Sequence, residues 1–393
     1  MAFDSDSPGL VPGDTNRARD IFVYDRDNGT LERVSQGPGG RQANGDSQRP
    51  TLSTDGRFVA FWSAADNLVD GDTNRETDCF VNDRQTHETV RVDVGPNDVQ
   101  ANGECARPVI SGDGKLVAFE SAASNLEKAG VLGKTTDTNK ARDVFVRDLA
   151  AGTTTRISVG TDGKQGAGES VRPAISTDGR YVAFQSDAPL QADDTNKKTD
   201  VYLRDMQAEE TTRISIGPGG VEGNGGSFSP SMSADGRLIA YWSNASNLVP
   251  ADTNKTGDVF VFDRNDGSTT RVSVGSGDVQ GDGMSSDPSI SPDGRYVTFW
   301  SGAANLVPDD TNGKRDIFLV DRDSATVTRV SIADDGTQGD GDSFSPNVGS
   351  GGGLVAFDSA ARTLVSGDHK TKGSDIFLHS EDNPQSTSPP AGQ

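Results

Sequence analysis

The sequence is poor in the residues that usually mark a metal or redox site. It holds two cysteines, Cys79 and Cys105, and three histidines, His87, His369 and His379, in 393 residues. The histidines occupy unrelated positions and lack the spacing of a zinc site. Related segments place Ile or Val where Cys79 stands and Ser where Cys105 stands. We therefore expect both cysteines to be unpaired replacements rather than a disulfide.

Basic residues, long apolar runs and catalytic motifs are also scarce. Lys and Arg number 37 against 59 Asp and Glu, a net charge of −22. Such a chain would repel a phosphate backbone, so we expect no nucleic-acid partner. No apolar run approaches the roughly 18 residues of a membrane helix, which excludes a helical span. A Gly-x-Ser-x-Gly turn and a phosphate-binding loop are both missing, so an enzyme is not the favoured class.

What the sequence has in abundance is a repeat of about 58 residues. Its most regular feature is an aromatic residue that falls at Phe3, Phe61, Phe119, Phe184, Tyr241, Phe299 and Phe357. A long period filled with short strands and turns indicates a β-propeller. We predict an all-β, seven-bladed β-propeller of four-stranded blades over residues 1–380, followed by a disordered Ser/Pro-rich tail over 381–393.

Each repeat predicts four short strands, of the kinds seen at residues 49–53, 58–63, 20–25 and 31–35. An Asp-Gly turn joins the first strand to the second. The third and fourth strands carry an Asp and an Arg eight residues apart, which predicts a repeated ion pair across the hairpin. The predicted pairs are Asp25/Arg33, Asp83/Arg91, Asp148/Arg156, Asp205/Arg213, Asp263/Arg271 and Asp321/Arg329.

The segment at residues 230–243, PSMSADGRLIAYWS, and the segment at 316–321, DIFLVD, carry a family resemblance. They resemble the strand-turn-strand phrase and the following strand of the TolB-like, PD40 (WD40-like) propeller repeat. The resemblance covers nearly all of residues 1–380 but departs in a long Asp-Thr-Asn loop within each repeat. It implies a β-propeller that is commonly extracytoplasmic and often acts through protein contacts, without implying one activity.

The two ends of the repeat array are incomplete. Second and third strands are found seven times, but first and fourth strands only six times. We therefore predict that the first and last blades each miss one strand and that the chain begins within a blade. Such a chain would not show a signal peptide even if its parent had one. We expect a monomer whose parent protein is secreted, periplasmic or at the cell surface.

Two kinds of connection share one end of the blades, namely the loop between the second and third strands and the link to the next blade. Both are long and polar, so this long-loop face is the predicted functional face. It also holds an insertion of about seven residues around Glu127–Lys134.

The loop between the second and third strands carries the motif Asp-Thr-Asn-x-x-x-Asp. Oxygen ligands at alternating positions resemble the first half of a calcium loop. The alternative is an Asx turn, in which the Asp and Asn side chains bond loop backbone groups. No cofactor is required by the sequence, and calcium is the cation that these loops could hold. The candidate calcium ligands are Asp14, Asn16, Asp20, Asp70, Asp72, Asn74, Asp78, Asp252, Asn254, Asp258, Asp310, Asn312 and Asp316; a seventh copy, around Asp368, has lost its Thr-Asn.

The residue after the repeated aromatic varies more than its neighbours. It is Asp4, Trp62, Glu120, Gln185, Trp242, Trp300 or Asp358 in successive repeats. Tryptophans and acids together suit a sugar or peptide groove, so the candidate ligand-binding residues are Trp62, Glu120, Gln185, Trp242 and Trp300. The alternative is that the tryptophans fill wider gaps between blades.

Three functional interpretations follow. The first is a non-enzymatic propeller that binds a protein or glycan on its long-loop face. The second is a carbohydrate-active enzyme, a lyase or hydrolase, with carboxylates at the mouth of the channel. The third is a calcium-stabilised structural module of a larger surface protein.

Overall fold

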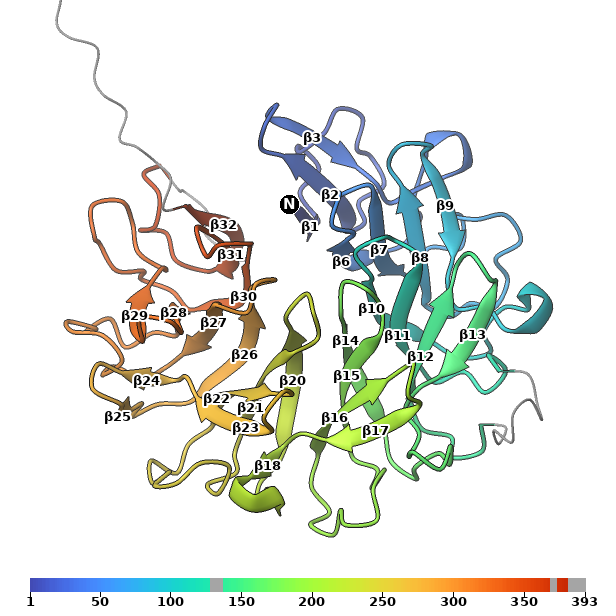
Figure 1. Ribbon diagram of the computed structural model, residues 1–393. Helices are drawn as coiled ribbons and strands as arrows, with labels where there is room; N and C mark the ends of the chain where they lie inside the picture. The colour runs from blue at the N-terminus through green and yellow to red at the C-terminus, as the bar shows by residue number, and fades with distance from the viewer. Residues whose placement is uncertain (128–136, 368–372, 381–393) are drawn as a thin grey trace, which may run out of the picture. The chain divides into compact units, whose positions relative to one another are not determined.

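The computed structural model describes residues 1–127, 137–367 and 373–380, which are coloured in Figure 1. The predicted tail over 381–393, most of the insertion after Glu127, and Asp368 lie outside the described residues. The chain divides into two compact units, Met1–Pro230 and Ser231–Gln393, which are treated separately below. Within the described residues, no helix is long and apolar enough to cross a bilayer.

The first unit contains the first four blades. They are built from β1 (Ala2–Ser5), β2 (Asp20–Asp25) and β3 (Thr30–Arg33); β6 (Ser47–Leu52), β7 (Phe58–Ser63), β8 (Asp78–Asp83) and β9 (Glu88–Arg91); β10 (Cys105–Ile110), β11 (Leu116–Ser121), β12 (Asp143–Asp148) and β13 (Thr153–Arg156); and β14 (Ser170–Ile175), β15 (Tyr181–Ser186), β16 (Asp200–Asp205) and β17 (Glu210–Arg213). Links between blades add β4 (Gln36–Gly37), β5 (Arg41–Gln42), β18 (Ile216–Gly217), β19 (Val221–Glu222) and the short 3-10 helices η1 (Pro38–Gly40), η2 (Pro96–Asp98) and η3 (Pro218–Gly220).

The division between the units falls inside β20, the first strand of the fifth blade. The remaining strands are β20 (Ser227–Met232), β21 (Leu238–Ser243), β22 (Asp258–Asp263) and β23 (Ser268–Arg271); β26 (Ser285–Ile290), β27 (Tyr296–Ser301), β28 (Asp316–Asp321) and β29 (Thr326–Arg329); β30 (Ser343–Val348), β31 (Leu354–Ser359) and β32 (Asp375–Ser380); and the link strands β24 (Val274–Gly275) and β25 (Val279–Gln280). Over the residues that the structure describes, seven antiparallel blades, with three strands in the first and last, confirm the predicted propeller.

The repeated aromatic residue forms the core of each blade. It packs against an aromatic of the third strand, as Phe119 stacks on Phe145, with ring centroids between 5.7 and 6.1 Å apart in the seven blades. Apolar clusters then join successive blades: Ala60 and Val81 of the second blade pack with Val117 of the third. Burial of apolar area therefore stabilises each blade through its neighbour.

The first strands of neighbouring blades adjoin one another in the first unit, where β6, β10 and β14 lie side by side and β9, β13 and β17 lie outermost (Figure 1). We call these first strands the inner strands. Each is entered from the long-loop face and leaves through the short Asp-Gly turn, so its first residues lie nearest the long loops.

The expectation of unpaired cysteines is wrong. Cys79 at the start of β8 and Cys105 at the start of β10 form a disulfide, with Cα atoms 5.6 Å apart. The cause is a backbone hydrogen bond between blades, from Cys105 N–H to the Thr77 carbonyl at 2.7 Å. This bond brings the start of each inner strand beside the third strand of the preceding blade, so two different repeat positions become neighbours in space.

The predicted ion pair across the outer hairpin is also wrong. In the second blade Asp83 lies opposite Glu88 and Arg91 lies opposite Phe80. Arg91 is thus three residues out of register with Asp83 and projects from the other face of the sheet. Asp83 pairs instead with Arg57, at 2.6 Å. The equivalent pairs are Arg180–Asp205, Arg237–Asp263 and Arg295–Asp321.

These pairs make a prediction for acid stability. The bond from Arg57 lowers the pKa of Asp83 to about 2 from its ordinary 3.8. Between about pH 2 and pH 4 the folded state therefore binds fewer protons than the unfolded state. The contribution of the Asp83 charge to the free energy of unfolding is complete above about pH 4 and is lost as the pH falls toward 2. We expect Asp83→Asn to reduce the unfolding free energy at pH 7 by at most about 1 kcal/mol, because the Arg57 side chain is 39% exposed. Urea unfolding at pH 7 and near pH 2 measures this; a difference that persists at the lower pH would contradict it.

Candidate functional site

The Asp-Thr-Asn loops tie the blades to their links. Asn16 Nδ2 donates to Asp20 Oδ2 at 2.8 Å and to the Ala43 carbonyl at 3.0 Å, and Asn16 Oδ1 accepts from Ala18 N–H at 3.1 Å. The last bond is an Asx turn. Equivalent turns are made by Asn74, Asn139, Asn196, Asn254 and Asn312. The motif thus positions the start of the third strand.

A buried arginine lies between the two carboxylates of the loop motif. In the first blade Arg33 Nη1 is 3.1 Å from Asp14 Oδ1 and 3.5 Å from Asp20 Oδ2. Burial raises the pKa of Asp20 above its ordinary value, and the guanidinium opposes that shift. Equivalent pairs are Arg91 with Asp72 and Asp78, Arg156 with Asp137 and Asp143, Arg271 with Asp252 and Asp258, and Arg329 with Asp310 and Asp316. The sequence pattern showed the acids but not this partner.

The second-blade loop contains the remaining calcium candidate, Asp70. Its side chain is 89% exposed and lies 3.7 Å from Arg41, whereas the Asp72 side chain is 2% exposed beside Arg91. These two acids therefore differ in environment although they are neighbours in the motif.

The fourth-blade loop has a more acidic composition. Asp194, Asp200 and Glu222 bring carboxylate oxygens within 4.8 Å of one another. Glu222 accepts from Arg213 Nη1 at 2.8 Å, and Asp194 accepts from the Tyr202 hydroxyl. Burial raises the pKa of Asp200 to about 6. Asp194 and Asp200 belong to the fourth copy of the Asp-Thr-Asn motif, whereas Glu222 was not named from the sequence, and all three acids have partners within the chain.

The position after the repeated aromatic connects each blade to the next inner strand. Asp4 Oδ1 accepts from Arg49 N–H at 3.1 Å, Glu120 Oε2 from Arg172 N–H at 2.7 Å, and Gln185 Oε1 from Ser229 N–H at 2.9 Å. In these three blades the variable position is thus a contact between blades, and its side chain accepts from a main-chain N–H.

The tryptophans at this position pack in the same direction. Trp300 is 9% exposed, with its ring edge-on to Phe344 at 5.8 Å and below the Arg315 guanidinium at 5.2 Å. Trp62 and Trp242 are partly buried against the clusters of their own units. Trp62 and Glu120 occupy neighbouring blades of the first unit, while Trp242 and Trp300 do so in the second.

The inner strands carry a feature that the sequence interpretation missed. The third residue of each inner strand has positive φ, 53° at Arg49, 50° at Arg107 and 56° at Arg172. The strand register shifts at this point, a β-bulge of the kind that often re-aims a side chain beside a site. Ser229, Asp287 and Ser345 occupy the position in the later blades, with φ of 51°, 47° and 50°. The Arg-Pro pairs in three successive repeats were the available signal.

One buried acid, Glu120, lies beside the arginines of this strand position. We call Arg49, Arg107 and Arg172 the inner-strand arginines. Arg107 Nε lies 3.8 Å from Glu120 Oε1, and Arg142 Nη1 approaches the same oxygen at 3.5 Å. Burial raises the pKa of Glu120, while the Arg172 N–H bond and the charges of all three inner-strand arginines oppose the shift. Glu120 is 3% exposed, so the cluster holds one shielded negative charge among several positive ones.

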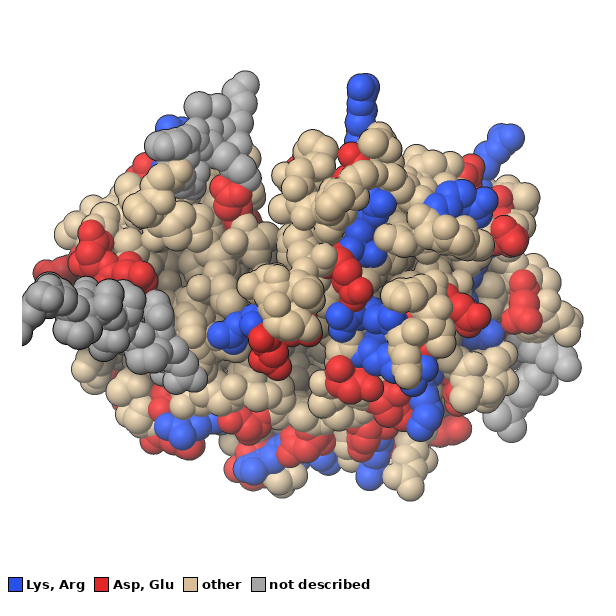
Figure 2. All heavy atoms as spheres, turned by 90° about the horizontal axis from the view of Figure 1, so that it is seen from above, with Lys and Arg blue, Asp and Glu red and all other residues tan. Residues whose placement is uncertain are grey.

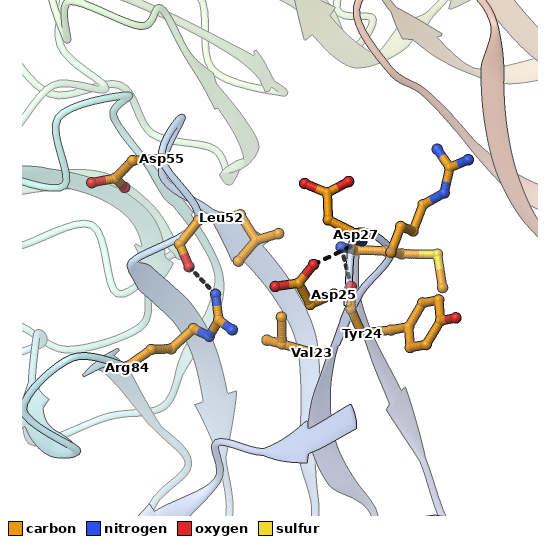
Figure 3. Close-up of a pocket in the computed structure, with 10 residues that line it drawn as sticks. Val23, Tyr24, Asp25, Asp27, Leu52, Asp55 and Arg84 are labelled. Carbon is orange, nitrogen blue, oxygen red and sulfur yellow. Dashed lines mark hydrogen bonds between the residues drawn. The ribbon is translucent and has the colours of Figure 1, made fainter. Parts of the chain in front are cut away.

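A separate hollow of about 360 Å³ lies among the short turns of the first two blades. Figure 3 shows Val23 and Asp25 of the first blade near Leu52 and Arg84 of the second. Arg84 also forms an ion pair with Glu32. This hollow is at the opposite end of the blades from the long loops, so it is not the predicted functional face.

The outer surface differs from the arginine-rich surroundings of Glu120 in the distribution of its charges. Figure 2 shows acidic and basic side chains interspersed on the face that it draws. Such mixing is expected where surface carboxylates pair with arginines, as in the Arg57–Asp83 pair.

Comparison with known proteins shows the architecture. No family model matches the chain, and no curated protein matches its sequence. Among solved structures, TolB from Acinetobacter baumannii is 17% identical with a TM-score of 0.45, over 84% of this chain and 62% of TolB. An oligogalacturonate lyase in complex with manganese is 12% identical with a TM-score of 0.54, over 92% and 83%. An acylaminoacyl peptidase from Pyrococcus horikoshii is 11% identical with a TM-score of 0.52, over 96% of this chain and 51% of the peptidase. The last two likenesses show the fold alone. The chain is a β-propeller.

Proposed function

We propose that this propeller is a non-enzymatic, extracytoplasmic binding protein for a protein or glycan partner. The observation that carries the proposal is the approach of two successive inner strands to buried Glu120, where Arg107 Nε lies 3.8 Å from Oε1 and Arg172 N–H donates to Oε2 at 2.7 Å. Each arginine is the third residue from the end of its strand that adjoins the long loops. The cluster therefore lies toward the long-loop end of the inner strands.

The disulfide supports an extracytoplasmic setting. Cys79–Cys105 joins two blades through residues that are both fully buried. Stable disulfides of this kind are typical of oxidising compartments. Expression with and without export to such a compartment, followed by thiol titration, tests this part of the proposal.

Binding itself is tested with the purified oxidised chain on a glycan array and in pull-downs. We expect a retained partner whose signal falls for Arg107→Gln and remains for Arg295→Gln, which changes an exposed arginine of another blade. Incubation of any bound glycan should leave its chain length unchanged. Release of shorter products would support the lyase or hydrolase alternative instead. Among the candidate ligand residues, Glu120 belongs to the proposed site, and Trp62, Gln185, Trp242 and Trp300 stay predictions as ligand contacts.

Calcium binding by the loops also stays a prediction, with a defined test. Arg91 already balances Asp72 and Asp78 in the second blade, at 2.7 and 3.6 Å. We therefore expect a chelator to shift the melting temperature by less than about 1 °C, and Asp72→Asn to destabilise the chain equally with and without calcium. Differential scanning calorimetry measures both. A clear fall on chelation that Asp72→Asn reduces would establish a calcium-stabilised module.

A further inference from the structure

The last blade has three strands, and one edge of its third strand is open. Its sheet consists of β30, β31 and β32 in that order (Figure 1), so β31 covers only one edge of β32. In the described part of the chain, no strand pairs with the other edge. The main-chain N–H and C=O groups of such an edge are a template for another strand. The last blade is therefore built to accept one more strand.

The sixth blade, in the same unit, shows which contacts a fourth strand makes with the third. Val330 N–H donates to the Ile317 carbonyl at 2.8 Å, and Ile317 N–H donates to Ser331 Oγ at 3.0 Å. Ser331 Oγ in turn donates to Asp316 Oδ1 at 2.6 Å. The same two bonds of the third strand recur in the six blades for which the structure describes a fourth strand, with Asp93 in place of the serine in the second blade. A fourth strand is thus held by its main chain and by one side-chain oxygen.

The strand β32 presents the same groups at the same positions. Asp375, opposite the last serine of β31, stands where Asp316 stands opposite the last serine of β27. Ile376 therefore corresponds to Ile317, and its N–H and C=O face the open edge. Leu378, two residues further on, faces the same edge because the pairing direction alternates along a strand. The side chains of Ile376 and Leu378 are 44% and 37% exposed, so an apolar residue of an added strand finds apolar partners here.

The six described fourth strands share a sequence pattern that defines the added strand. Each leads through an arginine to Val or Ile and then to Ser, or to Asp in the second blade. Arg329 Nη1 lies 3.7 Å from Asp316 Oδ2, so the arginine complements the acid that begins the third strand, which is Asp375 in the last blade. All six copies of the pattern are already bonded within their own blades, and residues 381–393 contain no Arg, Val or Ile. No copy in this sequence is left for the open edge, which favours a strand from another chain.

We propose that the open edge of β32 binds an extended segment of a partner protein that carries Arg, then Val or Ile, then Ser. The segment pairs antiparallel with β32 and completes the blade. Its Val or Ile N–H donates to the Ile376 carbonyl, and its serine hydroxyl accepts from the Ile376 N–H and donates to Asp375. This edge is separate from the Glu120 cluster of the first unit, so the inference goes beyond the proposed function.

Fluorescence anisotropy with a labelled peptide tests the proposal. The probe has the sequence of residues 325–332, ATVTRVSI, which contains the fourth strand of the sixth blade. We expect this peptide to bind the purified oxidised chain. The same peptide with Val330→Pro lacks the N–H for the Ile376 carbonyl, so it should bind about tenfold more weakly or worse. Binding of neither peptide, or equal binding of both, would overturn the proposal.

Two variants of the chain then locate the bound peptide. Ile376→Pro removes an N–H from the open edge and leaves the pairing with β31, a position at which a strand tolerates proline. This variant should bind the peptide about tenfold more weakly or worse. Ile376→Val keeps the N–H and is the matched control, with an affinity within about twofold of the wild type. Equal binding by the two variants would place the peptide elsewhere and overturn the proposal. If Ile376→Pro does not fold, the comparison of the two peptides on the wild-type chain still decides.

Discussion

Replacing Cys79 and Cys105 together by alanine is expected to lower the free energy of unfolding by about 3–5 kcal/mol. The bridge closes a segment with a sequence separation of 26. Loop-closure entropy for such a segment accounts for roughly 3.5 kcal/mol, and lost packing around two fully buried side chains adds to it. Urea unfolding of the oxidised wild type and the double variant measures the difference.

A second double variant separates the crosslink from the packing. Cys79→Val with Cys105→Ser restores the residues that other blades hold at these positions. The serine introduced in place of Cys105 would face Ser121 as Ser47 faces Ser63, where the hydroxyls are 2.9 Å apart. We expect this variant to lose only the entropic part and to be more stable than the alanine pair. If reducing the wild type leaves its unfolding midpoint unchanged, the stabilising role of the disulfide is refuted.

The repeat predicted the strands well because each blade repeats one alternation of apolar and polar residues. The predicted second strand at 58–63 is β7, and the third at 20–25 is β2. Contacts between blades were harder to predict, because they join different positions of the repeat. The disulfide is one example, and the bond from Arg172 N–H to Glu120 is another.

The register between the third and fourth strands of each blade was the other feature that could not be predicted from the sequence. The hairpin pairs Asp83 with Glu88, so Arg91 lies opposite Phe80 and projects from the other face of the sheet. Arg91 would lie opposite Asp83 only if the turn also included the first three residues of β9. Asp93 shows a further local exception. It stands where other blades have a buried serine, and burial followed by the nearby charge of Asp78 raises its pKa well above the ordinary value. Neither the partner of Arg91 nor the environment of Asp93 is visible in a spacing of residues.

The corrected pairing places a buried arginine between two acids of each loop, and Arg329→Met tests what this arrangement contributes to stability. Arg329 Nη1 lies 2.9 Å from Asp310 and 3.7 Å from Asp316, and Asp316 is fully buried. Removing the guanidinium leaves two acids facing each other without a counter-charge, a change that typically costs about 3–5 kcal/mol. We expect that loss in urea unfolding at pH 7.

The same substitution at Arg295 in the same blade provides the control. Arg295 pairs with Asp321 at 2.6 Å, but its side chain is 43% exposed, so Arg295→Met should cost far less than Arg329→Met. Adding Asp310→Asn to Arg329→Met should recover part of the loss, since it removes one of the two facing charges. Adding Asp321→Asn to Arg329→Met should recover nothing, because Asp321 belongs to Arg295. Recovery by Asp321→Asn and not by Asp310→Asn would restore the hairpin pair predicted from the sequence and refute the assignment of Arg329 to the loop.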